Sequence, residues 1–209
     1  MRISIVGVGQ LGGTLARTLG SHGHEVAAVS SRSRERTAAT VAGWSGVQAA
    51  ELSEVAAGDL VVLAVPYDAV PQVLAAIDLR DRVLVDATNA FTDVWEPLEV
   101  DDPRGTTGVV ADLAPGARVV KAFNTLPAER YVEDARERAA SAQRFGLPVA
   151  ADDVAARDEV ADLAGDAGFT AVPVGDLTDG ARLMQPASPL FNVPLTAREL
   201  EDRLAQLRG

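Results

Sequence analysis

Short runs of apolar residues alternate along this chain with stretches in which apolar residues recur at helical spacing. The apolar runs predict buried strands at residues 3–6, 26–29, 60–65, 83–85, 119–123, 149–151 and 170–174. The stretches between them predict helices at residues 11–19, 34–41, 69–77, 128–138 and 154–164. This alternation predicts an α/β fold, a Rossmann-type doubly wound parallel sheet built from right-handed βαβ units.

The alternation of predicted strands and helices is interrupted twice, and these interruptions predict the domain organisation. Residues 88–116 are rich in turn-forming residues, so we expect a long loop that carries a helix at residues 107–113 and covers a functional site. After Phe145 the pattern resumes with a strand, a helix and a strand, and the chain from residue 176 onward is expected to be mainly helical. We therefore predict a Rossmann domain of residues 1–144 and a small C-terminal α/β lobe of residues 145–209.

A glycine pattern, G-x-G-x-x-G, directly follows the first predicted strand and opens the first predicted helix. Gly7 permits a tight turn, Gly9 lets the backbone approach a pyrophosphate, and Gly12 lets helix and strand pack closely. Glycines that serve only a packed turn are the alternative. The context favours a dinucleotide site, whose predicted pyrophosphate-binding residues are Gly7, Val8, Gly9, Gln10, Leu11 and Gly12.

The end of the second predicted strand indicates which dinucleotide binds. NAD enzymes place an acidic residue there to hold the ribose 2′-hydroxyl, but this chain has Ser30, Ser31 and Arg32. Hydroxyl and guanidinium groups suit a 2′-phosphate, so NADP is favoured, with Arg32 as the strongest candidate and Arg36 as a second. Some of residues 34–36 fit a solvated helix face equally well.

Composition and net charge exclude several classes of protein function. Nineteen Lys and Arg against thirty Asp and Glu give a net charge of −11, which repels nucleic acid and anionic membranes. The chain has no Cys and two His, so disulfides, thiol chemistry and a Cys or His metal site are not expected. No apolar run is long enough for a membrane span. We expect a cytoplasmic protein whose partners are small-molecule cofactors.

Reductases of carbonyls and imines commonly use a side chain as proton donor beside the hydride acceptor. Few such side chains lie at the predicted strand ends. His22 and His24 fall at the opposite edge of the sheet, and Lys121 lies within an apolar run, either reaching a cleft or pointing outward. Tyr67 lies just past a strand end, where a tyrosine either covers the cofactor or acts as a general acid. Tyr131 is the last candidate. We therefore predict no catalytic residue.

Small or neutral residues occupy those strand ends instead. They suit a flat aromatic ring that needs positioning and exclusion of water more than a general acid. The cofactor-binding residues predicted there are Ala64, Val65, Pro66, Ala122 and Asn124.

Six segments together resemble the NADPH:F420 oxidoreductases and their bacterial relatives over nearly the whole chain: residues 6–12, 31–32, 63–67, 85–89, 119–125 and 181–184. The resemblance implies hydride exchange between NADP and the deazaflavin coenzyme F420, with the two rings stacked between the Rossmann part and the C-terminal lobe. It implies that Ser188, Pro189 and Leu190 form a wall of the second coenzyme's pocket, and that the protein is a homodimer formed through its C-terminal helices. Asn124 stands where some members carry His.

Three functions stay open at this point. The leading one is an NADPH-dependent oxidoreductase that reduces F420 or a similar stacked flavin-type acceptor. The second is an NADPH-dependent reductase of a small imine or carbonyl, with Tyr67 or a water as the proton donor. The third is a non-catalytic NADP-binding sensor. Reduction of a deazaflavin by NADPH separates the first from the others.

Replacing Arg32 tests the cofactor preference. Arg32→Ala is expected to raise the KM for NADPH and to leave the KM for NADH nearly unchanged, because a charge-assisted contact to phosphate contributes about 1.5–3 kcal/mol. Steady-state kinetics with both cofactors measure this. Equal weakening of the two would refute the assignment of Arg32 to the 2′-phosphate.

Overall fold

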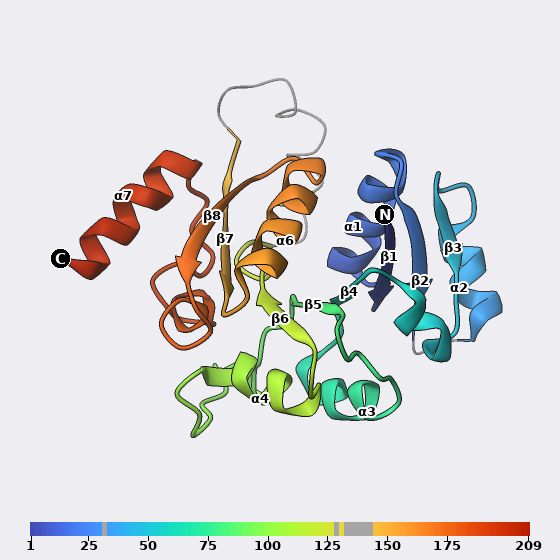
Figure 1. The fold of residues 1–209 in the computed structure, drawn as a ribbon, viewed down its shortest axis with the longest axis horizontal. Coiled ribbons are helices and arrows are strands. Elements are labelled where there is room, and N and C mark those ends of the chain that lie inside the picture. Colours follow the sequence, from blue (N-terminus) through green and yellow to red (C-terminus); the bar gives the residue numbers. More distant parts are fainter. Residues whose placement is uncertain (31–32, 128–129, 132–143) are drawn as a thin grey trace.

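A computed structural model describes residues 1–30, 33–127, 130–131 and 144–209, and within them the strands form one eight-stranded sheet in the order β3-β2-β1-β4-β5-β6-β7-β8 (Figure 1). Every neighbouring pair is parallel except β6 and β7. The strands are β1 (Arg2–Val6), β2 (Glu25–Val29), β3 (Val47–Ala49), β4 (Leu60–Leu63), β5 (Val83–Asp86), β6 (Arg118–Lys121), β7 (Gly146–Ala151) and β8 (Thr170–Gly175).

Helices cover both faces of this sheet, and each face has its own hydrophobic core. One core contains buried residues of α1, α2 and α6, and the other contains those of η1, α3, α4, η3 and α7. The α-helices are α1 (Gln10–Ser21), α2 (Arg34–Val41), α3 (Val70–Ala75), α4 (Gly105–Leu113), α6 (Val154–Asp166) and α7 (Ala197–Arg208), and the 3-10 helices are η1 (Leu52–Ala57), η2 (Tyr67–Ala69) and η3 (Ala181–Met184). None of the helices in the described ranges is both long and apolar enough to cross a membrane.

The order of the first six strands, 3-2-1-4-5-6, is that of the doubly wound Rossmann sheet, so the predicted fold class is confirmed. The last two strands extend the same sheet, because β7 pairs with β6 through Val120↔Ala151 and Lys121↔Ala150. The sheet therefore continues across the boundary predicted at residues 144 and 145. The division into two domains stays a prediction.

Several predicted elements differ in detail. The short strand β3 and the 3-10 helix η1 were not predicted, because three strand residues and six residues of 3-10 helix carry too little periodicity. The helix expected at residues 69–77 is divided into η2 and α3. The helix expected at residues 128–138 falls almost entirely outside the described residues.

The chain after residue 176 is less helical than predicted, which is a correction. Helical structure there comprises η3 and α7, and most of the stretch between them forms turns and irregular chain. Pro186, Pro189 and Pro194 lie in that stretch and lack the backbone N–H that a continuing helix would use. Thr196 starts α7 with a capping box in which Glu199 takes part.

A buried ion pair joins β5 to β6 at the ends of these strands. Lys121 Nζ donates to Asp86 Oδ2 at 3.1 Å and to the carbonyl oxygen of Thr88, and both charged side chains are at most 1% exposed. Asp86 also accepts hydrogen bonds from the hydroxyls of Thr88 at 2.6 Å and Thr107 at 2.9 Å. Desolvation lowers the pKa of Lys121, and the carboxylate of Asp86 opposes this effect. The side chain thus lies inside the fold, and the alternative of an outward position was wrong.

Breaking this pair should be costly, because the remaining charge would be buried without a partner. Asp86→Ala is expected to lower the free energy of unfolding by about 3–5 kcal/mol, measured by urea denaturation. The double variant Asp86→Leu/Lys121→Met should lose less than the single one, since it leaves no buried charge. A double variant that is less stable than Asp86→Ala would contradict this account.

Candidate functional site

The glycine turn between β1 and α1 is held between two neighbouring strands. The N–H of Gly7 donates to Val29 at the end of β2 at 2.8 Å, and the N–H of Ala64, after β4, donates to Val6 at 2.8 Å. Gly7 has a φ of +105°, and a Cβ there would collide with the carbonyl oxygen of Ala64. A Cβ at Gly12 would collide with the carbonyl oxygen of Gly7. These two glycines are therefore required by the fold itself.

Gly9 is different, because the protein around it leaves room for a side chain. A Cβ at Gly9 would have no atom within 4 Å, the residue is exposed, and its φ of −82° is open to any residue. It is the N-cap of α1, where no side chain caps the helix and no acidic residue lies in the first turn. The open space faces a helix N-terminus, which attracts anions, so these residues fit a bound pyrophosphate.

A cavity of about 620 Å³ adjoins this turn at the C-terminal ends of β1, β2 and β4, and we call it the turn cavity. Seven predicted cofactor-binding residues line it: Gly7, Val8, Gly9, Ser30, Ala64, Val65 and Pro66. Thr37, Thr40, Leu52, Asp68 and Gln72 also line it and were not predicted. The spacing of Thr37 and Thr40, one helical turn apart in a helix that follows β2, is the signal that could have revealed them.

The other predicted residues lie around the turn cavity or away from it. Gln10 and Leu11 begin α1, and Arg36 lies exposed on α2. Ala122 and Asn124 are buried and do not line the turn cavity. Ser31 and Arg32 lie outside the described residues.

Residues of α2 bound one end of the turn cavity. The hydroxyls of Ser30 and Thr37 form a hydrogen bond of 2.7 Å. The Ser33 hydroxyl caps α2 by accepting a hydrogen bond from the N–H of Arg36. Arg34 instead pairs with Glu54 at 3.2 Å and does not line the turn cavity. Arg34 thus lies on the exposed face of α2 and forms an ion pair with η1, which the sequence did not predict.

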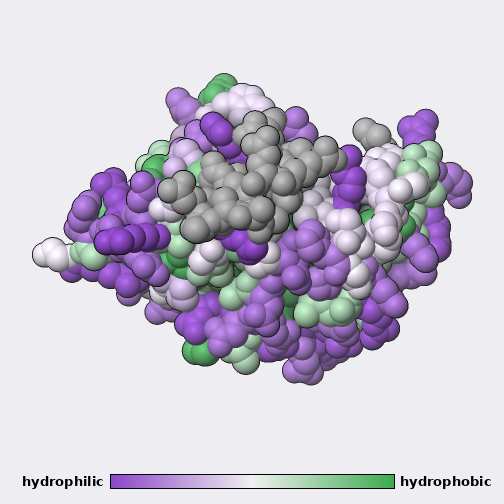
Figure 2. Space-filling view, turned by 90° about the horizontal axis from the view of Figure 1, so that it is seen from above, coloured by the Kyte–Doolittle hydropathy of each residue, from purple (hydrophilic) through white to green (hydrophobic). Residues whose placement is uncertain are grey.

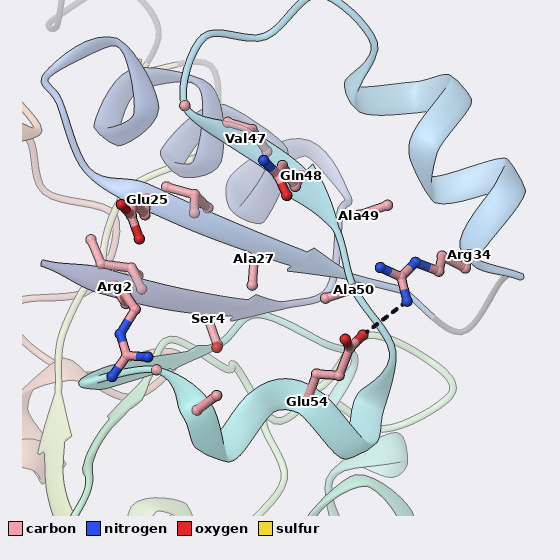
Figure 3. A pocket seen from close by; sticks show the side chains of 15 residues that line it. Arg2, Ser4, Glu25, Ala27, Arg34, Val47, Gln48, Ala49, Ala50 and Glu54 are labelled. Carbon is pink, nitrogen blue, oxygen red and sulfur yellow. Dashed lines mark hydrogen bonds and ion pairs between the residues drawn. The ribbon is translucent and has the colours of Figure 1, made fainter.

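Arg34 lines a different hollow of about 440 Å³, drawn in Figure 3. This hollow lies over β1, β2 and β3 beside η1, where small side chains such as Ser4 and Ala27 leave the sheet thinly covered. None of the predicted cofactor-binding residues lines it. It is therefore separate from the glycine turn.

Two asparagines connect the ends of β5 and β6 to the C-terminal segment. Asn89 Nδ2 donates to the carbonyl oxygen of Asn124 at 2.8 Å, and Asn124 Nδ2 donates to Asn89 Oδ1 at 2.9 Å and to the carbonyl oxygen of Met184 at 2.7 Å. Two carbonyl oxygens thus fix which way the Asn124 amide points. Its Oδ1 is buried and has no partner among the described residues, although buried acceptors are usually paired.

Beside this junction lies a second cavity of about 820 Å³, which we call the loop cavity. It is bounded by the predicted loop and by the segment after η3, and its lining residues are Glu96, Pro97, Leu98, Glu99, Val100, Asp102, Gly105, Arg182, Gln185, Pro186, Ala187 and Ser188. Gln185 Nε2 is buried there without a partner among the described residues. Of the three residues predicted for an acceptor wall, Ser188 lines it, whereas Pro189 and Leu190 do not.

Tyr67 lies between the surroundings of the two cavities, and its hydroxyl is engaged in a hydrogen bond. Its hydroxyl donates to the carbonyl oxygen of Thr106 at 3.2 Å, which joins η2 to α4. Burial raises the pKa of Tyr67 to about 12, and the carboxylates of Asp86 and Asp102 add to the effect. The hydroxyl therefore stays protonated at neutral pH and is already used as a donor.

The remaining candidate proton donors lie elsewhere. His22 is exposed at the end of α1, and His24 Nε2 contacts Asp166 Oδ2 at 3.0 Å. Tyr131 is buried against Phe123 and Phe169. Among the residues that the structure describes, no His, Lys or Tyr lines the turn cavity or the loop cavity. Carboxylic acids do line them: Asp68 in the turn cavity, and Glu96, Glu99 and Asp102 in the loop cavity.

Comparisons with known proteins agree with this arrangement. Residues 2–90 match the family described as NADP oxidoreductase coenzyme F420-dependent. A crystal structure of a hypothetical protein from Sinorhizobium meliloti is 30% identical, with a TM-score of 0.85, over 94% of this chain and 95% of that one. An Arthrobacter protein with the provisional name of F420-dependent NADP reductase is 27% identical, with a TM-score of 0.71, over 93% and 98%.

More distant structures share the fold alone. An imine reductase from Aspergillus terreus, solved with NADPH4 and dibenz[c,e]azepine, is 18% identical with a TM-score of 0.63. The alignment covers 99% of this chain but 62% of that one.

Filling the space at Gly9 tests the pyrophosphate site. Gly9→Val is expected to abolish binding of NADPH without unfolding the protein, because the new side chain would occupy only the space that the ligand needs. Gly165→Val, another glycine with nothing within 4 Å of its Cβ, is the matched control and should keep binding. Calorimetric titration and circular dichroism measure the two effects. A folded Gly9→Val variant that still binds NADPH would place the site elsewhere.

Proposed function

Because this chain belongs to the family of coenzyme F420-dependent NADP oxidoreductases, we propose that it transfers a hydride between NADPH and F420 or a similar stacked flavin-type acceptor. As a member of that family it is an NADP-dependent oxidoreductase. The structural observation that carries the proposal is the unfilled space at Gly9, which opens on the turn cavity at the ends of β1, β2 and β4.

In this proposal the glycine turn and the N-terminus of α1 hold the pyrophosphate of NADPH, and Ser30 with the start of α2 holds the adenosine ribose. Arg32 would bind the 2′-phosphate, and Arg36 lies exposed in the first turn of α2. Ala64, Val65 and Pro66 would lie along the nicotinamide half. The nicotinamide would then reach toward the ends of β5 and β6, where the asparagine pair anchors the wall of the loop cavity.

The loop cavity would receive the acceptor ring. When bound, NADPH would supply a hydride to the ring of the acceptor, and water would supply the balancing proton, so that NADP⁺ and the reduced acceptor would be the products. The chain's own task is to hold two flat rings in contact and to keep water away from the transferred hydride.

A direct assay tests the proposal. NADPH with purified protein is expected to bleach the absorbance of oxidised F420 under anaerobic conditions, and NADH should do so less efficiently. Reduction of a cyclic imine or a ketone, with no reduction of any deazaflavin or flavin, would instead support the small-substrate reductase. Binding of NADPH without turnover on any of these acceptors would support a sensor.

Substitution of Tyr67 tests whether the reaction depends on positioning of the rings or on a general acid. Removing a general acid commonly costs 10²–10⁴-fold in rate, so Tyr67→Phe should lower turnover by much less than about 100-fold. Ala64→Leu, which places bulk in the turn cavity, should do more damage, on the order of 100-fold, by misplacing the rings. Ala76→Leu, at an exposed position after α3, is the control. A thousandfold loss in Tyr67→Phe with NADPH binding intact would favour the imine or carbonyl reductase.

A further inference from the structure

One polar side chain on the wall of the loop cavity has no partner inside the described protein. Gln185 lines this cavity, and its Nε2 is buried without a hydrogen bond to any residue in the described ranges. Its Oε1 likewise accepts no hydrogen bond from those residues. Buried polar groups are usually hydrogen-bonded, and an unpaired one costs free energy in the folded state. An amide that carries this cost beside a cavity indicates that a ligand supplies its partner.

The backbone of Gln185 is held at this wall by its neighbours. Its carbonyl oxygen accepts hydrogen bonds from the hydroxyl of Ser188 at 2.6 Å and from the N–H of Ser188 at 3.0 Å. The carbonyl oxygen of the preceding residue, Met184, accepts a hydrogen bond from Asn124 Nδ2 at 2.7 Å. The start of the side chain is therefore fixed, whereas no hydrogen bond from the described residues fixes the carboxamide at its end.

Gly105 provides the place in which this carboxamide rests. Gly105 begins α4 with a φ of +65°, and a Cβ there would collide with Gln185 Nε2. The carboxamide therefore lies directly against the backbone of Gly105, which also lines the loop cavity. Since packing alone holds the amide there, rotation about the side-chain bonds of Gln185 brings its Nε2 and Oε1 to a ligand in the cavity.

The other residues that line the loop cavity do not offer the same group. Four of those described are charged: Glu96, Glu99, Asp102 and Arg182. The hydroxyl of Ser188 already donates to the carbonyl oxygen of Gln185, and the remaining described lining residues have no polar side chain. Gln185 is thus the one uncharged lining side chain in the described ranges with both a free donor and a free acceptor.

A buried amide distinguishes ligands better than an amide on the surface. On the face of the molecule seen in Figure 2, hydrophilic residues predominate, and water hydrates side chains of this kind. A ligand that binds a hydrated group exchanges one hydrogen bond for another, so the net gain is small. Gln185 Nε2 is buried, so a ligand that pairs with it removes the cost of an unpaired donor.

We infer that the carboxamide of Gln185 recognises the acceptor by the imide edge of its ring, where a carbonyl group stands beside a ring N–H. This inference rests on the proposed function. Flavins and deazaflavins both carry this edge on their pyrimidine-dione ring. Gln185 Nε2 donates to the ring carbonyl and Gln185 Oε1 accepts from the ring N–H, so the two groups pair through two hydrogen bonds. A small imine or ketone lacks this edge and leaves the amide unpaired.

Equilibrium binding to the NADP⁺-loaded protein tests the inference without turnover. Two probes are compared by fluorescence titration: the deazaflavin nucleoside and its N3-methyl derivative, which lacks the ring N–H. The wild type is expected to bind the nucleoside about tenfold more tightly, because methylation removes one hydrogen bond and blocks the pairing. Gln185→Met keeps the length of the side chain without the amide. It should weaken binding of the nucleoside about tenfold and leave binding of the methylated probe nearly unchanged.

The control variant Gln206→Met removes the same amide from an exposed position on α7 that lines neither cavity, and it should keep the wild-type preference. If circular dichroism shows that Gln185→Met does not fold, Gln185→Asn, which withdraws the amide by one methylene, replaces it with the same expected result. Equal binding of the two probes by the wild type, or a preference that persists in the Gln185 variant, would overturn the inference and leave the proposed function intact. If neither probe binds, the inference fails, and the proposed function fails with it only if NADPH also leaves F420 unreduced.

Discussion

The close backbone approach at the β1–α1 turn is the constraint on which the rest of this site depends. Gly7 and Gly12 leave no room for a Cβ because the carbonyl oxygens of Ala64 and Gly7 lie against them. That approach brings the N-terminus of α1 to the edge at which β1, β2 and β4 end. A side chain at either position would push the helix away, and the helix N-terminus would no longer face the turn cavity.

A second set of interactions fixes the other half of the site. The buried pair of Lys121 and Asp86 holds the ends of β5 and β6 together, and Asp86 reaches α4 through the hydroxyl of Thr107. Just beyond, Asn89 and Asn124 bind each other and the carbonyl oxygen of Met184. Because these polar groups satisfy one another inside the fold, the C-terminal segment is held against the strand ends instead of packing only on β7 and β8.

The two cavities therefore differ in origin and in chemistry. The turn cavity is formed by a local motif within β1, α1 and the neighbouring strand ends. The loop cavity needs the long loop and the segment after η3, which are separated by about eighty residues in sequence and meet at contacts such as Arg182 with Pro103. The first opens beside the N-terminus of α1, whereas the second is lined by the carboxylates of Glu96, Glu99 and Asp102 and by Gln185, whose Nε2 is buried.

The sequence by itself determined the fold class, the position of the glycine turn and most of the strands, because these depend on local periodicity and on glycines at fixed spacing. It also assigned different tasks to Gly7, Gly9 and Gly12, but it did not show that the carbonyl oxygen that blocks a Cβ at Gly7 belongs to Ala64, which follows β4 and is distant in the sequence. The tertiary structure decided that Lys121 is buried with Asp86, that Arg34 binds Glu54 and that the loop and C-terminal segment enclose one cavity. Each of these outcomes is a pairing between residues far apart in the chain, and a charge or an amide carries no local signal of the partner it will meet.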